Sequence, residues 1–310
     1  MIHPHQWSGN RGVGRTRVDG VYTCARGSGH FRDSPAARCD GNQLKMPLDK
    51  WTSGKDYDAW MGRWSRLLAK EFLVWLNIPA GARWLDVCCG TGITTQAIVE
   101  HTSPASVAGI DVNTAQMAVA REHRSHPKIC FELADAMALP FKNRSFDATI
   151  CGLSLQFIPD PHRALTEMRR TTRPGGTVAV YVWDFAEGAR FLRLFWDAAA
   201  EIDPGAAEYD QARRFPLCTP EGLREAFAAA RLDSPVVKPL EIVTRFANFD
   251  DYWEPMSTGQ GSAPHYLSLR DERTRLAIRD RLKVLLPADA QGAIVLPARS
   301  WAVRATVPLE

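Results

Sequence analysis

The residues most suited to chemistry lie in the segment WLDVCCGTGITT, residues 84–95. An apolar run with strand character leads into Gly90 and Gly92, and a glycine-rich turn between a strand and a helix is a common nucleotide-binding loop. Cys88 and Cys89 stand inside this turn, where small residues are expected. The segment therefore has two interpretations: a metal or redox site, or a cofactor loop with unusual side chains.

The cysteine pattern favours the second interpretation. The seven cysteines are scattered along the chain, with no C-x-x-C pair and no His/Cys cluster at zinc-ligand spacing. We interpret them as mostly buried, reduced thiols that behave as small apolar side chains. The sequence therefore predicts no metal site.

Acidic residues end three successive predicted strands, at Asp86, Asp111 and Asp135. Each could simply cap a helix, but the carboxyl ends of parallel strands meet at one edge of a sheet, where ligands bind. Asp111 follows Gly92 by 19 residues, a spacing that suits a carboxylate accepting hydrogen bonds from a ribose diol. Asp135 is expected to meet an adenine amino group. Together the three acids predict a nucleotide-type crevice.

The glycine turn differs from two common phosphate-binding loops. A dinucleotide fold uses G-x-G-x-x-G, and here Gly92 is followed by ITT, without the third glycine. A P-loop would need a lysine after the glycine, and none is present. Asp86 would repel phosphates and suits a cationic ligand instead.

The elements that must position these residues alternate between strand and helix. Strands are predicted at 83–89, 106–112, 129–135, 146–152 and 177–183, with helices at 92–101, 114–123 and 161–172 and a turn at 172–176. This alternation predicts a doubly wound, mostly parallel α/β sheet. One continuous amphipathic helix is expected before it, over 58–77. After it we expect a largely helical region (184–235), a strand (235–247), a helical insert (249–286) and a last strand (292–307).

Composition separates the first 45 residues from the rest. They hold seven of the 22 glycines, few aliphatic residues and a charge of +4, which leaves −1 for the remaining chain. We expect residues 1–45 to be a disordered extension with no role in folding, a basic arm being the alternative. We expect 46–310 to form a single domain with its core at about 80–183.

The near-neutral charge of residues 46–310 argues against a nucleic-acid partner. No apolar run is long enough to span a bilayer and no secretory signal is evident, so stable membrane anchoring is not expected and the expected location is cytoplasmic.

With these pieces in place, the sequence resembles the class I S-adenosylmethionine-dependent methyltransferases, in particular the ubiquinone/menaquinone-biosynthesis-like (methyltransferase type 11) group. The matching pieces are LDVCCGTG (85–92), GIDVN (109–113), ADAMALPF (134–141), SFDATICGLSLQFIPDP (145–161) and RPGGTVAV (173–180). The resemblance implies a Rossmann-like, seven-stranded sheet with helical inserts over its carboxyl edge. It also implies S-adenosylmethionine as co-substrate, without a metal.

The resemblance also implies roles for individual residues. Asp86, Gly90 and Gly92 would frame the amino-acid end of the cofactor, and Asp111 would hold its ribose. The other implied contacts are Val112 against adenine, Asp135 and Ala136 at the adenine edge, Leu153 near the sulfonium, and Tyr57 and Trp64 as a lid. Cys88 replaces the first glycine of the family's loop, a variant that we expect to be tolerated at a negative φ.

The sequence gives less information about the methyl acceptor and about a general base. Aromatic residues in the helical segments suggest a small, fairly apolar methyl acceptor, although they could instead pack these segments onto the sheet: Phe185, Phe191, Phe195, Trp196, Tyr252 and Trp253. Candidate bases are His162, His265, Tyr252 and Glu254, and no pairing selects one, so the catalytic residue is unknown.

Three other functions compete with small-molecule methylation. They are a non-catalytic S-adenosylmethionine-binding protein, an NAD-dependent oxidoreductase, which the missing third glycine disfavours, and a nucleic-acid methyltransferase. The last is disfavoured because GLSLQF follows the fourth strand instead of a Pro-Pro-aromatic element, and because Cys151 lacks the neighbouring proline of a cytosine-C5 nucleophile.

Overall fold

The computed structural model describes residues 49, 51, 53–257 and 260–309. The predicted disordered extension, residues 1–45, lies outside the described residues. Seven strands form one sheet in the order β3-β2-β1-β4-β5-β7-β6. The strands are β1 (Arg83–Val87), β2 (Ser106–Asp111), β3 (Ile129–Leu133), β4 (Phe146–Gly152), β5 (Thr172–Trp183), β6 (Asp233–Phe246) and β7 (Ile294–Thr306). β1 to β5 pair in parallel and β7 runs antiparallel to both of its neighbours, so the predicted doubly wound α/β sheet is confirmed.

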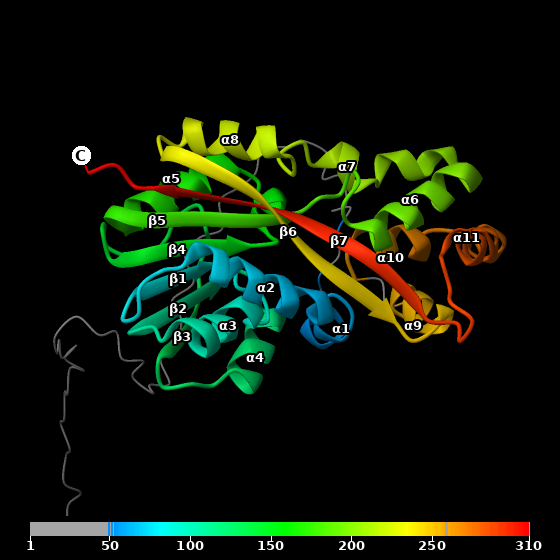
Figure 1. The fold of residues 1–310 in the computed structure, drawn as a ribbon, viewed down its shortest axis with the longest axis horizontal. Helices are drawn as coiled ribbons and strands as arrows, with labels where there is room; N and C mark the ends of the chain where they lie inside the picture. The colour runs from blue at the N-terminus through cyan, green and yellow to red at the C-terminus, as the bar shows by residue number, and fades with distance from the viewer. Residues whose placement is uncertain (1–48, 50, 52, 258–259, 310) are drawn as a thin grey trace, which may run out of the picture.

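Helices cover both faces of the sheet (Figure 1). α2 (Gly62–Leu76), α3 (Ile93–Thr102) and α4 (Thr114–His123) lie on one side of it, and α5 (Pro161–Thr171) and α8 (Pro220–Ala229) lie on the other. The strand order reverses between β1 and β4, whose crossovers leave in opposite directions. Such a switch point opens a crevice at the carboxyl ends of the strands.

The capping residues explain where the helices begin. Asn113 accepts hydrogen bonds from two backbone N–H groups of α4. Asp160 and Thr219 each accept one such bond, at α5 and α8, and each is followed by a proline at the first helical position. These caps satisfy N–H groups that the first turn leaves without partners. The predicted cap at Thr219 is confirmed.

The remaining helices gather at one end of the molecule, beside the parts of β6 and β7 that extend past the other strands (Figure 1). They are α1 (Gly54–Ala59), α6 (Arg190–Ile202), α7 (Gln211–Arg214), α9 (Phe249–Trp253), α10 (Ser262–Ser268) and α11 (Glu272–Leu285), with three short 3-10 turns: η1 (Leu155–Phe157), η2 (Pro204–Glu208) and η3 (Glu254–Ser257). Among the described residues, no helix has both the length and the apolar character needed to cross a membrane.

Two predicted elements differ from the structure. The expected helix over 58–77 is two helices, α1 and α2, which Trp60 and Met61 separate. Both of these side chains are buried and line the central cavity, so packing overrides the helical periodicity here. The expected turn at 172–176 belongs to β5, where the pairing with β4 shifts register between Phe146 and Ala148. Gly175, at φ +71°, accommodates this irregularity.

Candidate active site

A cavity of about 280 Å³ opens at the carboxyl ends of the parallel strands. Residues at or just after the ends of β1, β2, β3 and β4 form its floor, among them Cys88, Asp111, Asp135 and Leu153. Its other walls come from segments distant in sequence: residues 51–65, 181–192 and 260–264, and Gln211. The location agrees with the rule for open parallel sheets, and the volume approaches the roughly 300 Å³ at which ligand pockets begin.

The glycine turn places backbone close to this cavity. Gly90 and Gly92 have φ values of +56° and +80°, which glycine adopts at little cost. A Cβ atom on Gly90 would lie 2.5 Å from the amide oxygen of Gln116, so no larger residue fits without displacing that side chain. The Gly92 N–H donates to the Cys89 carbonyl at 2.8 Å, which closes the turn before α3.

The condition under which Cys88 was expected to be tolerated, a negative φ, is not met. Its φ is +55°, in the left-handed region, as in the two glycines that follow. Such a conformation costs a non-glycine residue about 1–2 kcal/mol. Leu153, after β4, also has a positive φ of 58° and also lines the cavity. Two residues with a strained backbone therefore lie at the floor of the cavity, a placement that is common at functional sites.

The Cys88 thiol is not a nucleophile in this environment. Its hydrogen bond to Cys151 and its burial raise its pKa well above the usual value. Burial also raises the pKa of Cys89. Both thiols therefore stay protonated at neutral pH. Among the described residues, no group of three or more His, Cys, Asp or Glu side chains is arranged to hold a metal ion.

The backbone at Cys88 leads to a stability prediction. Cys88→Gly is expected to raise the free energy of unfolding by up to about 1 kcal/mol, because relief of the left-handed strain exceeds the entropy cost of glycine. Urea unfolding measures the change. The control is Cys130→Gly in β3, which lacks a positive φ and should lose about 0.5–1 kcal/mol. Equal destabilisation of the two variants would contradict a strained Cys88.

Asp111 is held in place by the glycine turn. Its Oδ2 accepts a hydrogen bond from the Gly90 N–H at 2.9 Å and its Oδ1 accepts one from the Asn113 N–H at 2.8 Å. Burial raises the pKa of this carboxyl group, while the two N–H donors oppose that change. A carboxylate offers about four acceptor positions, so two remain for a ligand. Its neighbour Val112 is 66% exposed and also lines the cavity.

Asp86 is a buried acid without a cationic partner among the contacts that the structure describes. It is 1% exposed, it lines the cavity, and Thr95 Oγ1 donates to its Oδ2 at 2.6 Å. Burial raises its pKa to about 7, and the nearby Asp111 adds to the effect. A cationic ligand in the cavity would lower this pKa and restore the negative charge.

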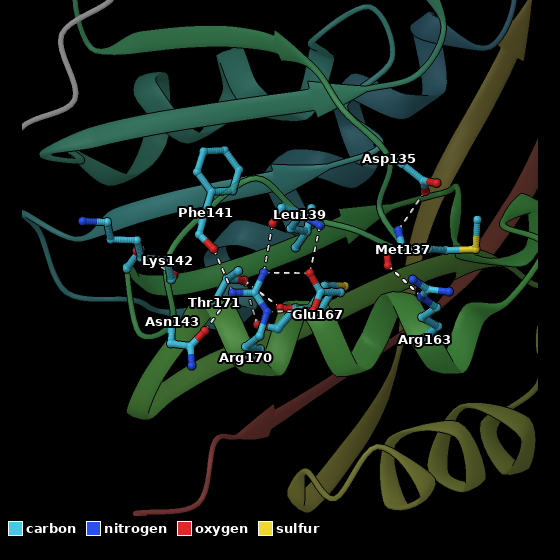
Figure 2. A network of polar contacts seen from close by, with 12 residues as sticks. Asp135, Met137, Leu139, Phe141, Lys142, Asn143, Arg163, Glu167, Arg170 and Thr171 are labelled. Atoms are coloured by element: carbon cyan, nitrogen blue, oxygen red, sulfur yellow. Dashed lines mark hydrogen bonds and ion pairs between the residues drawn. The ribbon is translucent and has the colours of Figure 1, made fainter. Parts of the chain in front are cut away.

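Asp135 and Ala136 lie two and three residues beyond β3, at the start of the loop to β4 (Figure 2). Asp135 Oδ1 accepts the Met137 N–H at 2.8 Å. The predicted strand 129–135 ends earlier, at Leu133, so these two residues belong to a loop. Both line the cavity.

Arg170 fastens this loop to α5 (Figure 2). Its guanidinium donates to the carbonyl groups of Leu139 and Phe141 and to Asn143 Oδ1, at 2.8–2.9 Å. It also forms two 2.7 Å hydrogen bonds with Glu167, which lower the pKa of that carboxyl group. Arg163 adds a bond to the Met137 carbonyl. A planar guanidinium with fixed partners is well suited to positioning a loop.

Of the two predicted lid residues, only Tyr57 reaches the cavity. Its hydroxyl lies 3.1 Å from Ser65 Oγ, and its ring meets Trp51 edge-on. Trp64 is 5% exposed, packs against Phe246 and is not among the lining residues that the structure describes. The structure therefore assigns Trp64 to the core.

Most of the aromatic residues proposed for the acceptor site also belong to the core. Phe185 lines the cavity, whereas Phe191, Phe195, Trp196 and Tyr252 are buried elsewhere and Trp253 stacks on Phe249. The alternative, that they pack the helical segments onto the sheet, is correct for these five. The aromatic walls of the cavity come instead from Trp51, Trp60, Phe157 and Trp183.

None of the four candidate bases lines the cavity in the described part of the chain. His162 is exposed, with its Nε2 3.0 Å from the Ala229 carbonyl. His265 is buried within α10. Tyr252 donates to the Phe191 carbonyl in the core, and burial raises its pKa. Glu254 is an exposed residue of η3.

Sequence reasoning missed the residues that close the cavity opposite the glycine turn. The Trp51 carbonyl accepts a hydrogen bond from Asn113 Nδ2 at 2.8 Å, and the Ser53 N–H donates to Gln260 Oε1 at 3.2 Å. Gly261 packs directly on the Trp51 ring. The contacts with Gln260 and Gly261 join segments more than 200 residues apart, and no local pattern in the sequence indicates them.

A comparison with known protein families matches the segment that carries the floor of the cavity. A family model described as a methyltransferase domain matches residues 85–180. The chain is 38% identical over 149 residues to a 2-phytyl-1,4-naphtoquinone methyltransferase of Thermosynechococcus vestitus, covering 47% of this chain and 66% of that protein. It is 31% identical over 183 residues to a demethylmenaquinone methyltransferase of Shouchella clausii, covering 54% of this chain and 78% of that protein. With a Staphylococcus aureus demethylmenaquinone methyltransferase the coverage of the relative falls to 47%, so the matched part spans from about half to four fifths of these proteins.

Solved structures share the fold at low sequence identity. A phosphoethanolamine N-methyltransferase 2 of Haemonchus contortus, in complex with phosphomonomethylethanolamine and S-adenosylhomocysteine, has a TM-score of 0.52 at 17% identity. The match covers 82% of this chain and 57% of that one. A candidate methyltransferase of Bacillus halodurans C-125 has a TM-score of 0.51 at 17% identity, covering 78% of this chain and 98% of that one.

Proposed function

The chain belongs to the S-adenosylmethionine-dependent methyltransferases, and from this premise we propose that it transfers a methyl group to a small, fairly apolar acceptor. The observation that carries the proposal is one cavity in which strand-end carboxylates and aromatic side chains meet. The carboxylates suit a cationic nucleoside, whereas the aromatic walls suit an apolar molecule.

The residues of the floor fit S-adenosylmethionine. Asp111 has acceptor positions left for a ribose diol, and Gly90 offers close backbone approach. Asp86 is a buried acid with a pKa of about 7, which a nearby positive charge would stabilise as the carboxylate. Val112, Asp135 and Ala136 would border the adenine and Leu153 the sulfonium, with Tyr57 above them. When bound, the cofactor supplies a methyl group already activated for transfer.

The chain then has to orient the acceptor and exclude water. An in-line displacement requires the acceptor atom behind the methyl carbon, and orientation of this kind can supply much of the rate. The side chains suited to this task are the apolar ones beyond Leu153, namely Trp60, Phe157, Trp183 and Phe185. The naphthoquinone-type and menaquinone-type substrates in the names of the relatives are apolar and aromatic, which makes a molecule of this class the first acceptor to test.

Calorimetry distinguishes this function from an NAD-dependent activity. S-adenosylmethionine and S-adenosylhomocysteine are expected to bind with Kd values well below about 1 mM, which corresponds to roughly −4 kcal/mol. NAD is expected not to bind, because the turn lacks the third glycine that the pyrophosphate site uses. Failure of S-adenosylhomocysteine to bind at 1 mM would refute the proposal.

A transfer assay addresses the non-catalytic alternative. The protein is incubated with methyl-labelled S-adenosylmethionine and a cell extract, and labelled products are identified by mass. We expect the label in the solvent-extractable, apolar fraction and not in nucleic acid. Cofactor binding without any labelled product would favour a binding protein, and labelled nucleic acid would contradict a small-molecule acceptor.

A further inference from the structure

The cavity has two halves that differ in their polar groups. The sheet order places β2 and β3 on one side of β1, and β4 and β5 on the other. The strand-end acids Asp111 and Asp135 therefore belong to the first half. The second half, beyond Leu153, holds Gln156, Phe157, Trp183 and Phe185. The proposed acceptor occupies this second half.

Several other polar side chains that line the cavity already have partners within the protein. Ser154 Oγ donates to the Gly152 carbonyl at 3.0 Å, Ser65 Oγ donates to the Met61 carbonyl at 3.0 Å, and Ser262 Oγ bonds Asp49. Gln260 Oε1 accepts the Ser53 N–H. These groups hold the walls of the cavity together, so they are poorly placed to recognise a ligand.

Gln156 differs, because half of its amide has no partner. The residue lies in η1, directly after β4, is 8% exposed and lines the cavity. Its Nε2 donates to the Leu153 carbonyl at 3.0 Å. A carbonyl only accepts hydrogen bonds, so this contact fixes the amide orientation and directs Oε1 away from Leu153. That oxygen is buried without a hydrogen-bond partner in the described structure.

A buried acceptor without a partner is costly and calls for an explanation. No described side chain supplies the missing donor, and Gln156 lines the cavity, so a ligand bound there is the available source of one. We propose that Gln156 is a specificity-determining residue that accepts a hydrogen bond from a hydroxyl or N–H group of the methyl acceptor. This inference rests on the proposed function. An amide oxygen is too weak a base to remove a proton, so Gln156 orients the acceptor and does not activate it.

Gln211 offers a matched control. It also lines the cavity and is 6% exposed. Its Oε1 accepts a hydrogen bond from Trp196 Nε1 at 3.0 Å. An indole N–H only donates, so this amide presents its NH₂ group, not its oxygen, to any ligand. Gln211 therefore cannot replace Gln156 as an acceptor.

The test compares two aromatic probes that differ by one hydrogen-bond donor, 2-naphthol and 2-methoxynaphthalene. Their binding to the full chain is measured by equilibrium dialysis with saturating S-adenosylhomocysteine, which prevents methyl transfer. The wild-type protein is expected to bind 2-naphthol about tenfold more tightly. Gln156→Met should bind the two probes within about twofold of each other, through loss of 2-naphthol affinity. Gln211→Met should keep the tenfold preference.

Equal binding of both probes by the wild-type protein, or a preference that survives in Gln156→Met, would overturn the inference. If Gln156→Met does not fold, Gln156→Asn withdraws the amide by one methylene and should lose the preference in the same way. Titration with S-adenosylhomocysteine tests the proposed function separately. If that ligand does not bind, dialysis with the probes alone still decides the role of Gln156.

Discussion

Asp111→Ala is expected to bind S-adenosylhomocysteine at least about 100-fold more weakly than the wild-type protein. This carboxylate lines the cavity and can accept further hydrogen bonds, and a hydrogen bond to a charged group contributes about 1.5–3 kcal/mol. Loss of two such bonds to a ribose diol amounts to roughly 3 kcal/mol, or about 100-fold. The substitution also frees the Gly90 and Asn113 N–H groups that Asp111 now holds. Isothermal titration calorimetry measures the change.

Asp147→Ala is the matched control for this experiment. Asp147 lies near the start of β4, at the opposite edge of the sheet, where it bonds Arg83 and Arg173. Its removal should lower stability but leave the Kd of S-adenosylhomocysteine within about threefold of wild type, because it is not among the lining residues. A folded Asp111→Ala protein with unchanged affinity would exclude the ribose role.

Asp86→Asn is expected to uncouple cofactor binding from pH. In the wild-type protein, the pKa of Asp86 is about 7, and a cationic ligand favours the carboxylate. S-adenosylmethionine binding should then release a proton below pH 7 and strengthen by up to about tenfold per pH unit as pH rises toward 7. Asparagine keeps the shape and can accept the Thr95 hydrogen bond, but it cannot become charged. Comparison of the two proteins between pH 5.5 and 8.5 isolates the Asp86 contribution from titration of the ligand itself.

Asp86→Asn should also change how stability depends on pH. In the wild-type protein, the free energy of unfolding should fall as pH rises, whereas cofactor affinity should rise. The folded protein holds the Asp86 proton up to pH of about 7, whereas an unfolded chain loses it near pH 4. The folded state therefore binds more protons within this window, so the free energy of unfolding falls as pH rises through it, by up to about 4 kcal/mol. Asp86→Asn should be more stable than wild type at pH 8 and similar at pH 4. A pH-independent difference in urea unfolding would contradict a raised pKa at Asp86.

The parallel part of the sheet could be predicted because its signals are local. Each strand is a short apolar run between turn residues, and caps such as Thr219 with Pro220 mark the helix starts. The strand-end acids followed from the same pattern, since a parallel sheet brings its carboxyl ends together. The family resemblance then supplied the cofactor, and the relatives and solved structures bear out the family and the fold.

The conformation at Cys88 was not predictable from residue type. Cysteine disfavours the left-handed region, yet the turn requires it there to connect β1 to Gly90. The sequence also could not separate aromatic residues of the core from those of the cavity. Trp64 and Trp60 lie one helical turn apart and both are buried, but only Trp60 lines the cavity. This distinction depends on the break between α1 and α2, which is imposed by tertiary packing.

The walls of the cavity come from two different sources within the chain. The floor, from Asp86 to Leu153, lies inside the segment 85–180 that matches the methyltransferase family model. Trp51, Trp60, Phe185, Gln211 and Gly261 lie outside it. Substitutions at Phe185 can therefore reshape the acceptor half, whereas substitutions at Trp51 also affect the donor half, because Trp51 contacts Asn113 and Tyr57. Evolution or protein engineering can therefore change the acceptor that the cavity binds while the residues that bind the methyl donor stay the same.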